Sequence, residues 1–307
     1  MAQRLVISAR NAALIAALLA SSGQALGQDM AIARARQVTA SYNMDFAPSP
    51  NGRRAVLIKM FGGREQLFTM NLDGSDERQI THDDADHEDP TWSPDGSKIA
   101  YVLIKDDKKI IHLMNPDGSG SEPVTPANQH TIHPSFTPDG KAILYCTDDD
   151  LRPPAKNESQ IYSVDLASRQ VRTLISGGVN TFPVMSPDGQ KIAFRRIVGD
   201  MNSEVFVADA DGRNAKNLTN NWTFEGWPTW SPDGKTIAFA GNRNNAGYQI
   251  FLMNHDGSNV RLLAATEGRG TAPKWAPDGR TIYFTVCRMS QDYHGCEVMA
   301  APVDPPR

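Results

Sequence analysis

The heptapeptide PTWSPDG occurs twice in this 307-residue chain, at residues 90–96 and again at 228–234. Related tetrapeptides recur along the chain: SPNG at 49–52, SPDG at 93–96, TPDG at 137–140, SPDG at 186–189, SPDG at 231–234 and APDG at 276–279. Their closing glycines lie 44, 44, 49, 45 and 45 residues apart. Repeats of this length are typical of β-propellers, in which one repeat forms one four-stranded blade. The sequence therefore predicts an all-β, six-bladed β-propeller with four antiparallel strands per blade.

Each repeat has the chemistry of a tight turn between two strands. Proline presets its own φ, Ser or Thr can bond back to the backbone, and Gly adopts conformations that other residues resist. After the turn, an isoleucine stands two positions before an aromatic residue, as in Ile99 with Tyr101 and Ile237 with Phe239. This spacing places both side chains on one face of a strand, where we expect them to pack against the neighbouring blade.

The last repeat has no fourth strand of its own, since the chain ends at Arg307 soon after the third. The sequence RQVT at residues 36–39 copies the fourth-strand pattern RQIT and lies before the first repeat. We expect this segment to form the outer strand of the last blade and so to close the ring.

The first 27 residues have the pattern of a secretory signal. Two arginines precede an apolar run over residues 12–20, and small residues follow up to Gly27. The apolar run is far shorter than the ~20 residues that a membrane-spanning helix needs. We therefore predict a signal peptide over 1–27, cleavage near Gly27, and an exported propeller over 28–307 that is not an integral membrane protein.

The net charge bears on the class of partner, and the cysteines bear on the structure. Residues 1–27 hold two of the 31 basic residues and none of the 35 acidic ones, so the mature chain has a charge of 29 − 35 = −6. This makes nucleic acid a poor candidate partner. Cys287 and Cys296 flank eight residues between two strand-like runs, and we predict that they form a disulfide, worth about 2–3 kcal/mol. Cys146, within AILYC, is predicted to be a small buried side chain.

These repeats resemble the WD-like repeats of the TolB family, which carry W-S-P-D-G, then I-A-F, then a strand ending M-N-x-D-G; the match covers roughly residues 32–307. The resemblance implies a periplasmic protein whose channel mouth binds a peptidoglycan-associated lipoprotein. TolB proteins also carry an N-terminal domain. Few residues separate the expected cleavage site from the first strand, so we expect that domain to be lacking. The fold alone does not define an activity.

In an antiparallel blade with strands A to D, the A–B and C–D turns share one face of the ring, here called the turn face. The B–C and D–A connections share the other, here called the loop face. The repeated turns occupy the turn face, so the differences between repeats concentrate on the loop face, where a binding site needs them. The D–A segments, which we expect to rim the central channel, contain the candidate binding residues Asp45, His87, Glu88, Asp89, His130, His133, Trp227 and Arg269, as well as Phe182 and Glu225.

Three histidines in adjacent repeats are candidate ligands of a divalent metal, because imidazole and carboxylate together suit such cations. They are His87, His130 and His133, next to Glu88 and Asp89. Solvated loop residues and a polar peptide-binding rim are the alternatives. Other acidic motifs have structural interpretations: Asp148-Asp149-Asp150 as a solvated run, Asp209-x-Asp211-Gly212 as a turn, and the aspartates of the repeated tetrapeptides as turn residues.

The chain contains no G-x-S-x-G elbow, no H-E-x-x-H, no phosphate loop and no dinucleotide fingerprint. We therefore predict a monomeric periplasmic scaffold that binds an envelope protein or peptide through its loop face, with no catalytic residue and no cofactor. The alternative is a metal-assisted lyase or hydrolase that acts on oligosaccharide or polysaccharide at the channel mouth, like the propeller lyases that resemble TolB.

Overall fold

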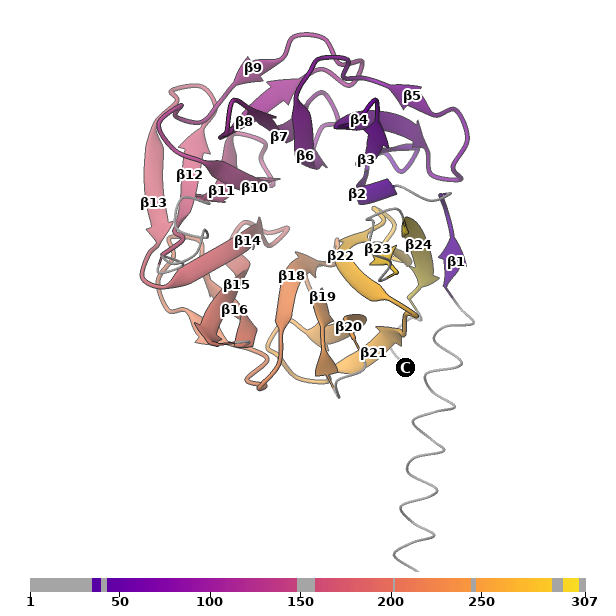
Figure 1. The fold of residues 1–307 in the computed structure, drawn as a ribbon. Coiled ribbons are helices and arrows are strands. Elements are labelled where there is room, and N and C mark those ends of the chain that lie inside the picture. The colour runs from indigo at the N-terminus through magenta and orange to yellow at the C-terminus, as the bar shows by residue number, and fades with distance from the viewer. Residues whose placement is uncertain are drawn as a thin grey trace, which may run out of the picture.

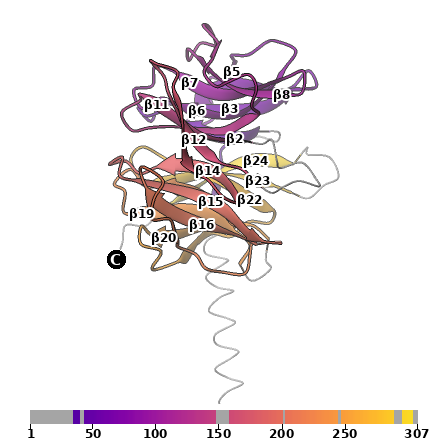
Figure 2. The ribbon, with the colours of Figure 1, turned by 90° about the vertical axis from the view of Figure 1, so that its left-hand side faces the viewer.

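The computed structural model describes residues 35–39, 43–147, 158–200, 202–243, 247–288 and 295–303. These residues form six four-stranded antiparallel sheets around a central axis (Figure 1), which confirms the predicted six-bladed propeller. Figure 2 shows the ring turned by 90°, with the fourth blade toward the viewer. No helix within the described ranges is long and apolar enough to cross a membrane.

The strands follow the chain blade by blade, from the innermost strand outward. Blade 1 contains β2 (Asn43–Pro48), β3 (Arg54–Phe61), β4 (Arg64–Asn71) and β5 (Arg78–Gln79). Blade 2 contains β6 (Asp86–Trp92), β7 (Ile99–Lys105), β8 (Lys108–Met114) and β9 (Glu122–Pro123). Blade 3 contains β10 (Thr131–Phe136), β11 (Ala142–Thr147), β12 (Ile161–Asp165) and β13 (Val171–Ile175).

The remaining blades repeat this order. Blade 4 contains β14 (Val179–Met185), β15 (Lys191–Gly199), β16 (Asn202–Asp209) and β17 (Lys216–Asn217). Blade 5 contains β18 (Glu225–Trp230), β19 (Thr236–Gly241), β20 (Gln249–Asn254) and β21 (Arg261–Ala264). Blade 6 contains β22 (Arg269–Trp275), β23 (Thr281–Cys287), β24 (Cys296–Pro302) and, as its outer strand, β1 (Arg36–Gln37).

The repeated tetrapeptide is a turn held by its own polar groups. In blade 2 the Ser93 hydroxyl donates to Asp95 Oδ1 at 2.6 Å and accepts the Lys98 N–H at 2.9 Å. Gly96 has a φ of +72° and donates its N–H to the Ser93 carbonyl at 2.9 Å. These hydrogen bonds, the one from Ser93 first, lower the pKa of Asp95 to about 2. The aspartate is thus a structural group of the turn.

Tryptophans before this turn connect neighbouring blades. Each indole N–H donates to a carbonyl on the inner strand of the preceding blade, in the pairs Trp92–Ala47 (3.1 Å), Trp230–Val184 (3.3 Å) and Trp275–Thr229 (3.3 Å). The repeated PTWSPDG therefore makes a turn and an inter-blade contact with the same few residues.

The core lies between the blades, as the spacing of isoleucine and aromatic residues predicts. Ile99 and Tyr101 of blade 2 are buried against Val56 and Ile58 of blade 1. The equivalent pairs in the next blades, such as Ile237 with Phe239, are fully buried as well. Each blade therefore buries its faces against its neighbours.

The DG turns between the third and fourth strands pack against the preceding blade and require glycine. A Cβ on Gly118 would lie 2.0 Å from the Ile80 carbonyl oxygen, and one on Gly212 would lie 1.8 Å from that of Leu174. Both glycines also have positive φ, +87° and +84°. Residues 209–212 are thus the predicted turn, in which Asp211 Oδ1 accepts the Arg213 N–H at 3.0 Å.

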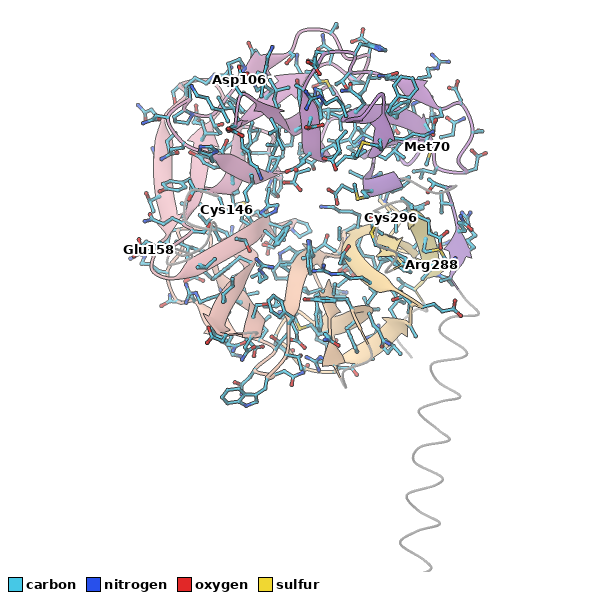
Figure 3. The ribbon with its side chains drawn as sticks, in the orientation of Figure 1. Met70, Asp106, Cys146, Glu158, Arg288 and Cys296 are labelled. Atoms are coloured by element: carbon cyan, nitrogen blue, oxygen red, sulfur yellow. A yellow bond between two sulfur atoms is a disulfide. The ribbon has the colours of Figure 1, made fainter. Side chains whose placement is uncertain are left out.

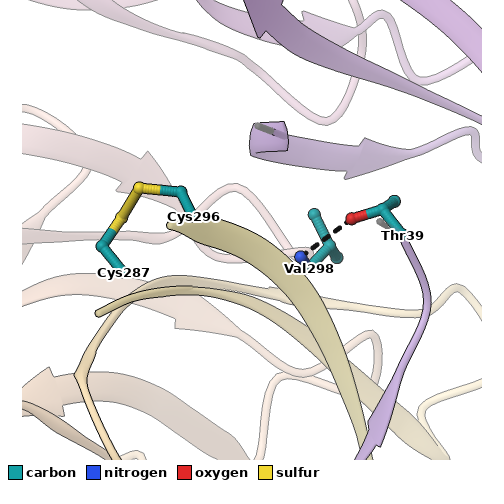
Figure 4. The surroundings of a disulfide bond; sticks show 4 residues. All are labelled: Thr39, Cys287, Cys296 and Val298. Atoms are coloured by element: carbon teal, nitrogen blue, oxygen red, sulfur yellow. Dashed lines mark hydrogen bonds between the residues drawn. A yellow bond between two sulfur atoms is a disulfide. The ribbon is translucent and has the colours of Figure 1, made fainter. Parts of the chain in front are cut away.

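The ring is closed as predicted. β1 pairs with β24, and beyond β1 the Val38 N–H donates to the Val298 carbonyl at 2.8 Å. The Val298 N–H donates to the Thr39 hydroxyl at 3.0 Å (Figure 4). The same figure shows the disulfide between Cys287 and Cys296, which face each other on β23 and β24. Cys146 is a buried free thiol.

Candidate functional site

Every inner strand contains a bulge at the same place. The pairing with the second strand skips two residues, so that in blade 2 Asp89 and Pro90 lie opposite Tyr101 alone. The first residue of each bulge has a φ of about +50°: Asp45 (+47°), Asp89 (+52°), His133 (+53°), Phe182 (+54°), Trp227 (+52°) and Ala272 (+49°). Such a conformation is uncommon for residues other than glycine, and strain of this kind clusters at functional sites. Bulges also re-aim side chains.

These bulge residues form a ring around a cavity of about 210 Å³ in the central channel. A second layer lies two residues further along each strand and includes Thr91, Ser135, Val184, Thr229 and Lys274. Figure 3 shows side chains from the inner strands projecting toward the centre of the ring. The cavity therefore presents six side chains that share one backbone geometry and differ in chemistry.

One side of the cavity is acidic. Among the described residues, Asp45 has no hydrogen-bond or ion-pair partner, and its pKa is raised to about 7 by burial and by Asp89, against an opposing effect of Lys274. Asp89 accepts the backbone N–H of His133 at 3.0 Å. Glu65, on β4, has a pKa raised to about 7 by burial and by the neighbouring carboxylates, of which Glu88 acts most strongly and Asp45 next. Two carboxyl groups near the cavity thus titrate close to neutral pH.

The opposite side is aromatic. The rings of His133 and Phe182 have centroids 3.7 Å apart, and those of Phe182 and Trp227 are 5.1 Å apart. The Arg195 guanidinium carbon lies 5.0 Å from the Phe182 ring and 5.8 Å from the Trp227 ring. Burial lowers the pKa of Arg195, and its Nε donates to the Thr181 hydroxyl at 2.9 Å. The arginine therefore spreads its charge over two aromatic faces behind the cavity wall.

The aromatic contacts continue beyond the cavity toward the loop face. The Trp227 ring meets that of Tyr248 at 5.9 Å between centroids, and the guanidinium carbon of exposed Arg269 lies 4.6 Å from the Tyr248 ring. Arg269, one of the predicted binding residues, thus lies at the rim of this aromatic side, outside the cavity lining.

Apart from Arg269, the predicted binding residues divide into three groups. Asp45, Asp89, His133 and Trp227 line the cavity, together with Phe182. Glu88 and His130 are partly buried nearby, and Glu88 Oε2 lies 3.8 Å from Lys109 Nζ. His87 and Glu225 are fully buried and do not line it.

His87 and Glu225 have partners inside the blades. His87 Nδ1 lies 3.1 Å from the Glu65 carbonyl, Nε2 lies 3.3 Å from Asp83, and its ring contacts that of Tyr101 at 5.5 Å between centroids. Glu225 Oε1 accepts a charge-assisted bond from Arg243 Nε at 2.5 Å. Both side chains therefore stabilise contacts within the described fold.

The three histidines suggested as metal ligands do not line one cavity, because His133 alone of the three borders the channel. Within the described ranges no group of three or more His, Cys, Asp or Glu residues is arranged to hold a metal ion. His133 instead contacts the buried Cys146, with Nδ1 3.2 Å from Sγ, and burial raises the pKa of that thiol to about 12. The acidic run 148–150 and the predicted signal at 1–27 lie outside the described residues.

Three residues of the site were not predicted from the sequence. Ala272 is the bulge residue of blade 6, and Lys274 is the second-layer residue of the same blade. Arg195 reaches the site from β15, the second strand of blade 4. A signal for Ala272 was present: in five repeats the bulge residue directly precedes the proline of the inner strand, at Pro90, Pro134, Pro183, Pro228 and Pro273. Arg195 had no such local signal.

Comparisons with known proteins agree with this architecture. The model of the TolB beta propeller domain matches residues 21–152 and 152–300. A putative TolB from Agrobacterium tumefaciens is 22% identical, with a TM-score of 0.65 over 86% of this chain and 91% of that one. TolB from Acinetobacter baumannii is 23% identical, with a TM-score of 0.63 over 86% of this chain and 63% of that one.

An oligogalacturonate lyase from Vibrio parahaemolyticus also has this fold, at 11% identity and a TM-score of 0.58 over 88% of this chain and 93% of that one. No curated protein matches the chain. The structural similarities at these identities concern the fold, whereas the family model matches nearly all of the repeat region. The chain belongs to the family of TolB β-propeller domains.

Proposed function

We propose that this protein is a periplasmic scaffold that binds an envelope protein or peptide through its loop face. The observation that carries the proposal is the location of the exposed large apolar side chains. Within the described residues these are Met60, Phe61, Val198 and Trp222, with exposed fractions of 42%, 57%, 47% and 91%.

All four lie on the loop face. Met60 and Phe61 end β3 at the B–C turn of blade 1, and Val198 lies at the B–C turn of blade 4. Trp222 lies in the D–A connection of blade 5, between β17 and β18. Exposed apolar and aromatic side chains are the groups from which protein interfaces draw most of their binding energy.

The cavity lies in the central channel between the two faces, because the bulge residues are the third or fourth of the six or seven residues of each inner strand. We propose that a partner resting on the apolar side chains also reaches into the channel. The family resemblance makes a peptidoglycan-associated lipoprotein the first candidate for this partner.

Affinity capture from solubilised envelope tests the proposal, with residues 28–307 as bait. The test variant is Phe61→Ser/Trp222→Ser, and Lys235→Ser on the turn face is the matched control. We expect the parent and the control to retain the same partner and the double variant to lose most of it. Equal retention by all three baits would remove the loop face as the binding surface.

A metal-assisted lyase or hydrolase remains the second candidate, because an oligogalacturonate lyase bound to manganese has a similar fold over 88% of this chain and His133 borders the cavity. That candidate predicts a higher melting temperature with excess Mn²⁺ and ultraviolet-absorbing unsaturated product from oligogalacturonate. Absence of both effects in the purified protein would exclude it.

A further inference from the structure

The Asp45 carboxylate is the most unusual group of the cavity. It projects from a bulge with a φ of +47° and lies on the cavity wall without a hydrogen-bond or ion-pair partner among the described residues. Buried or half-buried carboxylates normally have such partners, because leaving water costs free energy. A ligand that supplies the missing partner would recover that cost.

The surroundings of Asp45 favour a cation as this partner. Asp89 borders the same cavity from the next blade and raises the pKa of Asp45. Asp45 in turn contributes to the raised pKa of Glu65. Lys274, on β22, is the basic group that opposes this effect, and it forms no ion pair with Asp45 among the described residues. Asp89 Oδ2 has the His133 N–H at 3.0 Å and His133 Nε2 at 3.8 Å, so it is the charge of Asp45 that is incompletely balanced.

The rest of the wall favours a cation attached to an apolar stem. Phe182 and Trp227 stand across the ring from the two aspartates, and His133 lies between them and Asp89. Aromatic faces attract cations and pack against methylene groups. Phe182 and Trp227 border the cavity, whereas Arg195, which packs on the same rings, does not.

We propose that the cavity binds one long cationic side chain of a peptide partner, with its guanidinium or ammonium group between Asp45 and Asp89 and its stem against Phe182 and Trp227. The inference rests on the proposed function, because it identifies which part of the partner enters the channel. A cavity of about 210 Å³ has room for a single long side chain.

Binding of this cation is linked to pH. The Asp45 carboxyl, with a pKa of about 7 in the free protein, must ionise to pair with the cation. Its pKa falls on binding, so a proton is released, and affinity should rise by about tenfold between pH 6 and pH 8. The charged groups that face Asp45 are Asp89 on β6, Glu65 on β4 and Lys274 on β22.

The test is an NMR titration of the purified protein with N-acetylarginine amide and with its uncharged isostere N-acetylcitrulline amide. We expect the arginine compound to bind at least tenfold more tightly, and Asp45→Asn to remove most of that preference together with the pH dependence. Asparagine tolerates positive φ, so this variant should retain the fold. Its melting temperature checks this.

Asp106→Asn is the matched control, because Asp106 is an exposed acid with a φ of +52° at the B–C turn of blade 2, away from the central channel (Figure 3). It should bind the arginine compound like the parent. Phe182→Leu should weaken binding of both compounds. Equal affinity for arginine and citrulline, or no binding of either, would overturn the inference.

The two proposals fail differently. If Asp45→Asn captures the envelope partner as well as the parent does, the cation inference is wrong and the scaffold function stands. If the arginine compound binds but no partner is lost on Phe61→Ser/Trp222→Ser, the cavity site stands and the docking face is wrong.

Discussion

The turn face and the central cavity use their carboxylates in opposite ways. On the turn face the carboxylates of the repeated turns accept hydrogen bonds from their own Ser or Thr residues, as Asp95 and Asp233 do, and their pKa values are lowered. In the central cavity, Asp45 has a raised pKa and no hydrogen-bond or ion-pair partner among the described residues. The same residue type is thus structural in the turn that follows the inner strand and open to a ligand near the middle of that strand.

This difference shows that the repeat accounts for the fold but not for the binding chemistry. Repetition builds turns, inter-blade tryptophan contacts and bulges in identical positions, whereas the side chain on each bulge is free to vary. Substitutions can separate the groups that maintain the ring from those available for binding.

The largest effect should come from opening the ring. A chain that begins at residue 41 lacks β1, the Val38 contacts and the Thr39 hydroxyl that accepts the Val298 N–H. Lost hydrogen bonds at about 1 kcal/mol each and lost apolar burial together suggest about 4 kcal/mol. Thermal unfolding should show a melting temperature about 10 °C below that of residues 28–307. An unchanged melting temperature would contradict closure by β1. The single substitution Thr39→Val, which removes only the hydroxyl acceptor, should lower the unfolding free energy by about 1 kcal/mol.

The second test concerns a loop-face carboxylate that is structural. Glu225→Gln leaves the Arg243 charge without its buried partner, so we expect a loss of about 3 kcal/mol in urea unfolding. The comparison is Glu122→Gln, which breaks the Arg169–Glu122 pair, whose side chains are 40% and 60% exposed. That variant should change stability by less than about 0.5 kcal/mol. Similar losses of unfolding free energy in the two variants would mean that burial does not make the Glu225–Arg243 pair more important than the exposed pair.

A smaller effect should follow from the repeated tryptophan. Trp230→Phe keeps most of the ring in place but removes the N–H that donates to the Val184 carbonyl. We expect a loss of about 1 kcal/mol in chemical unfolding. Phe136→Leu is a useful reference, because phenylalanine at the equivalent position in blade 3 has no such donor. A loss for Trp230→Phe well under that for Phe136→Leu would show that the indole bond contributes little.

The strain at the bulges predicts a stabilising substitution. Ala272 has a φ of +49°, which glycine adopts more readily. Ala272→Gly should therefore raise the unfolding free energy by about 0.5–1 kcal/mol, the opposite sign to Ala193→Gly in the regular part of β15. Calorimetry of both variants compares them directly, and destabilisation by Ala272→Gly would show that the bulge is unstrained.

The smallest effect should be the pH dependence of one turn. The pKa of Asp95 is lowered to about 2 in the folded protein from its usual 3.8, so its contribution is complete above pH 4 and is lost as the pH falls through about 2. Because Asp95 is exposed, the effect should stay below about 0.5 kcal/mol. Asp95→Asn should flatten unfolding curves between pH 4 and pH 2, and identical slopes in parent and variant would contradict this.

Sequence reasoning predicts the fold almost completely, because its signals are local and repeated. The turn residues, the Ile–aromatic spacing and the RQVT segment at 36–39 each identify an element without knowledge of the others. Even ring closure, which joins residues far apart in the chain, follows from a short pattern that recurs where one strand is missing.

The site is less predictable because a bulge breaks the alternation of a strand. His87 and Asp89 are two residues apart and would share a face in a regular strand. The bulge turns Asp89 into the channel, whereas His87 stays between blades 1 and 2. The role of Arg195 is even harder to predict from sequence, because it depends on a contact between blades. Arg195 packs over Gly226 of the next blade, where a Cβ would lie 2.7 Å from the Arg195 Cδ.

The shared bulge has a consequence for how specificity can change in such a ring. Each of the six positions is created by backbone geometry that does not depend on the side chain it presents, as Asp, His, Phe, Trp and Ala all occur there. A substitution at one position therefore alters the chemistry of the cavity without repacking the blades. Relatives with this backbone can acquire new ligands one residue at a time, and an engineer can do the same.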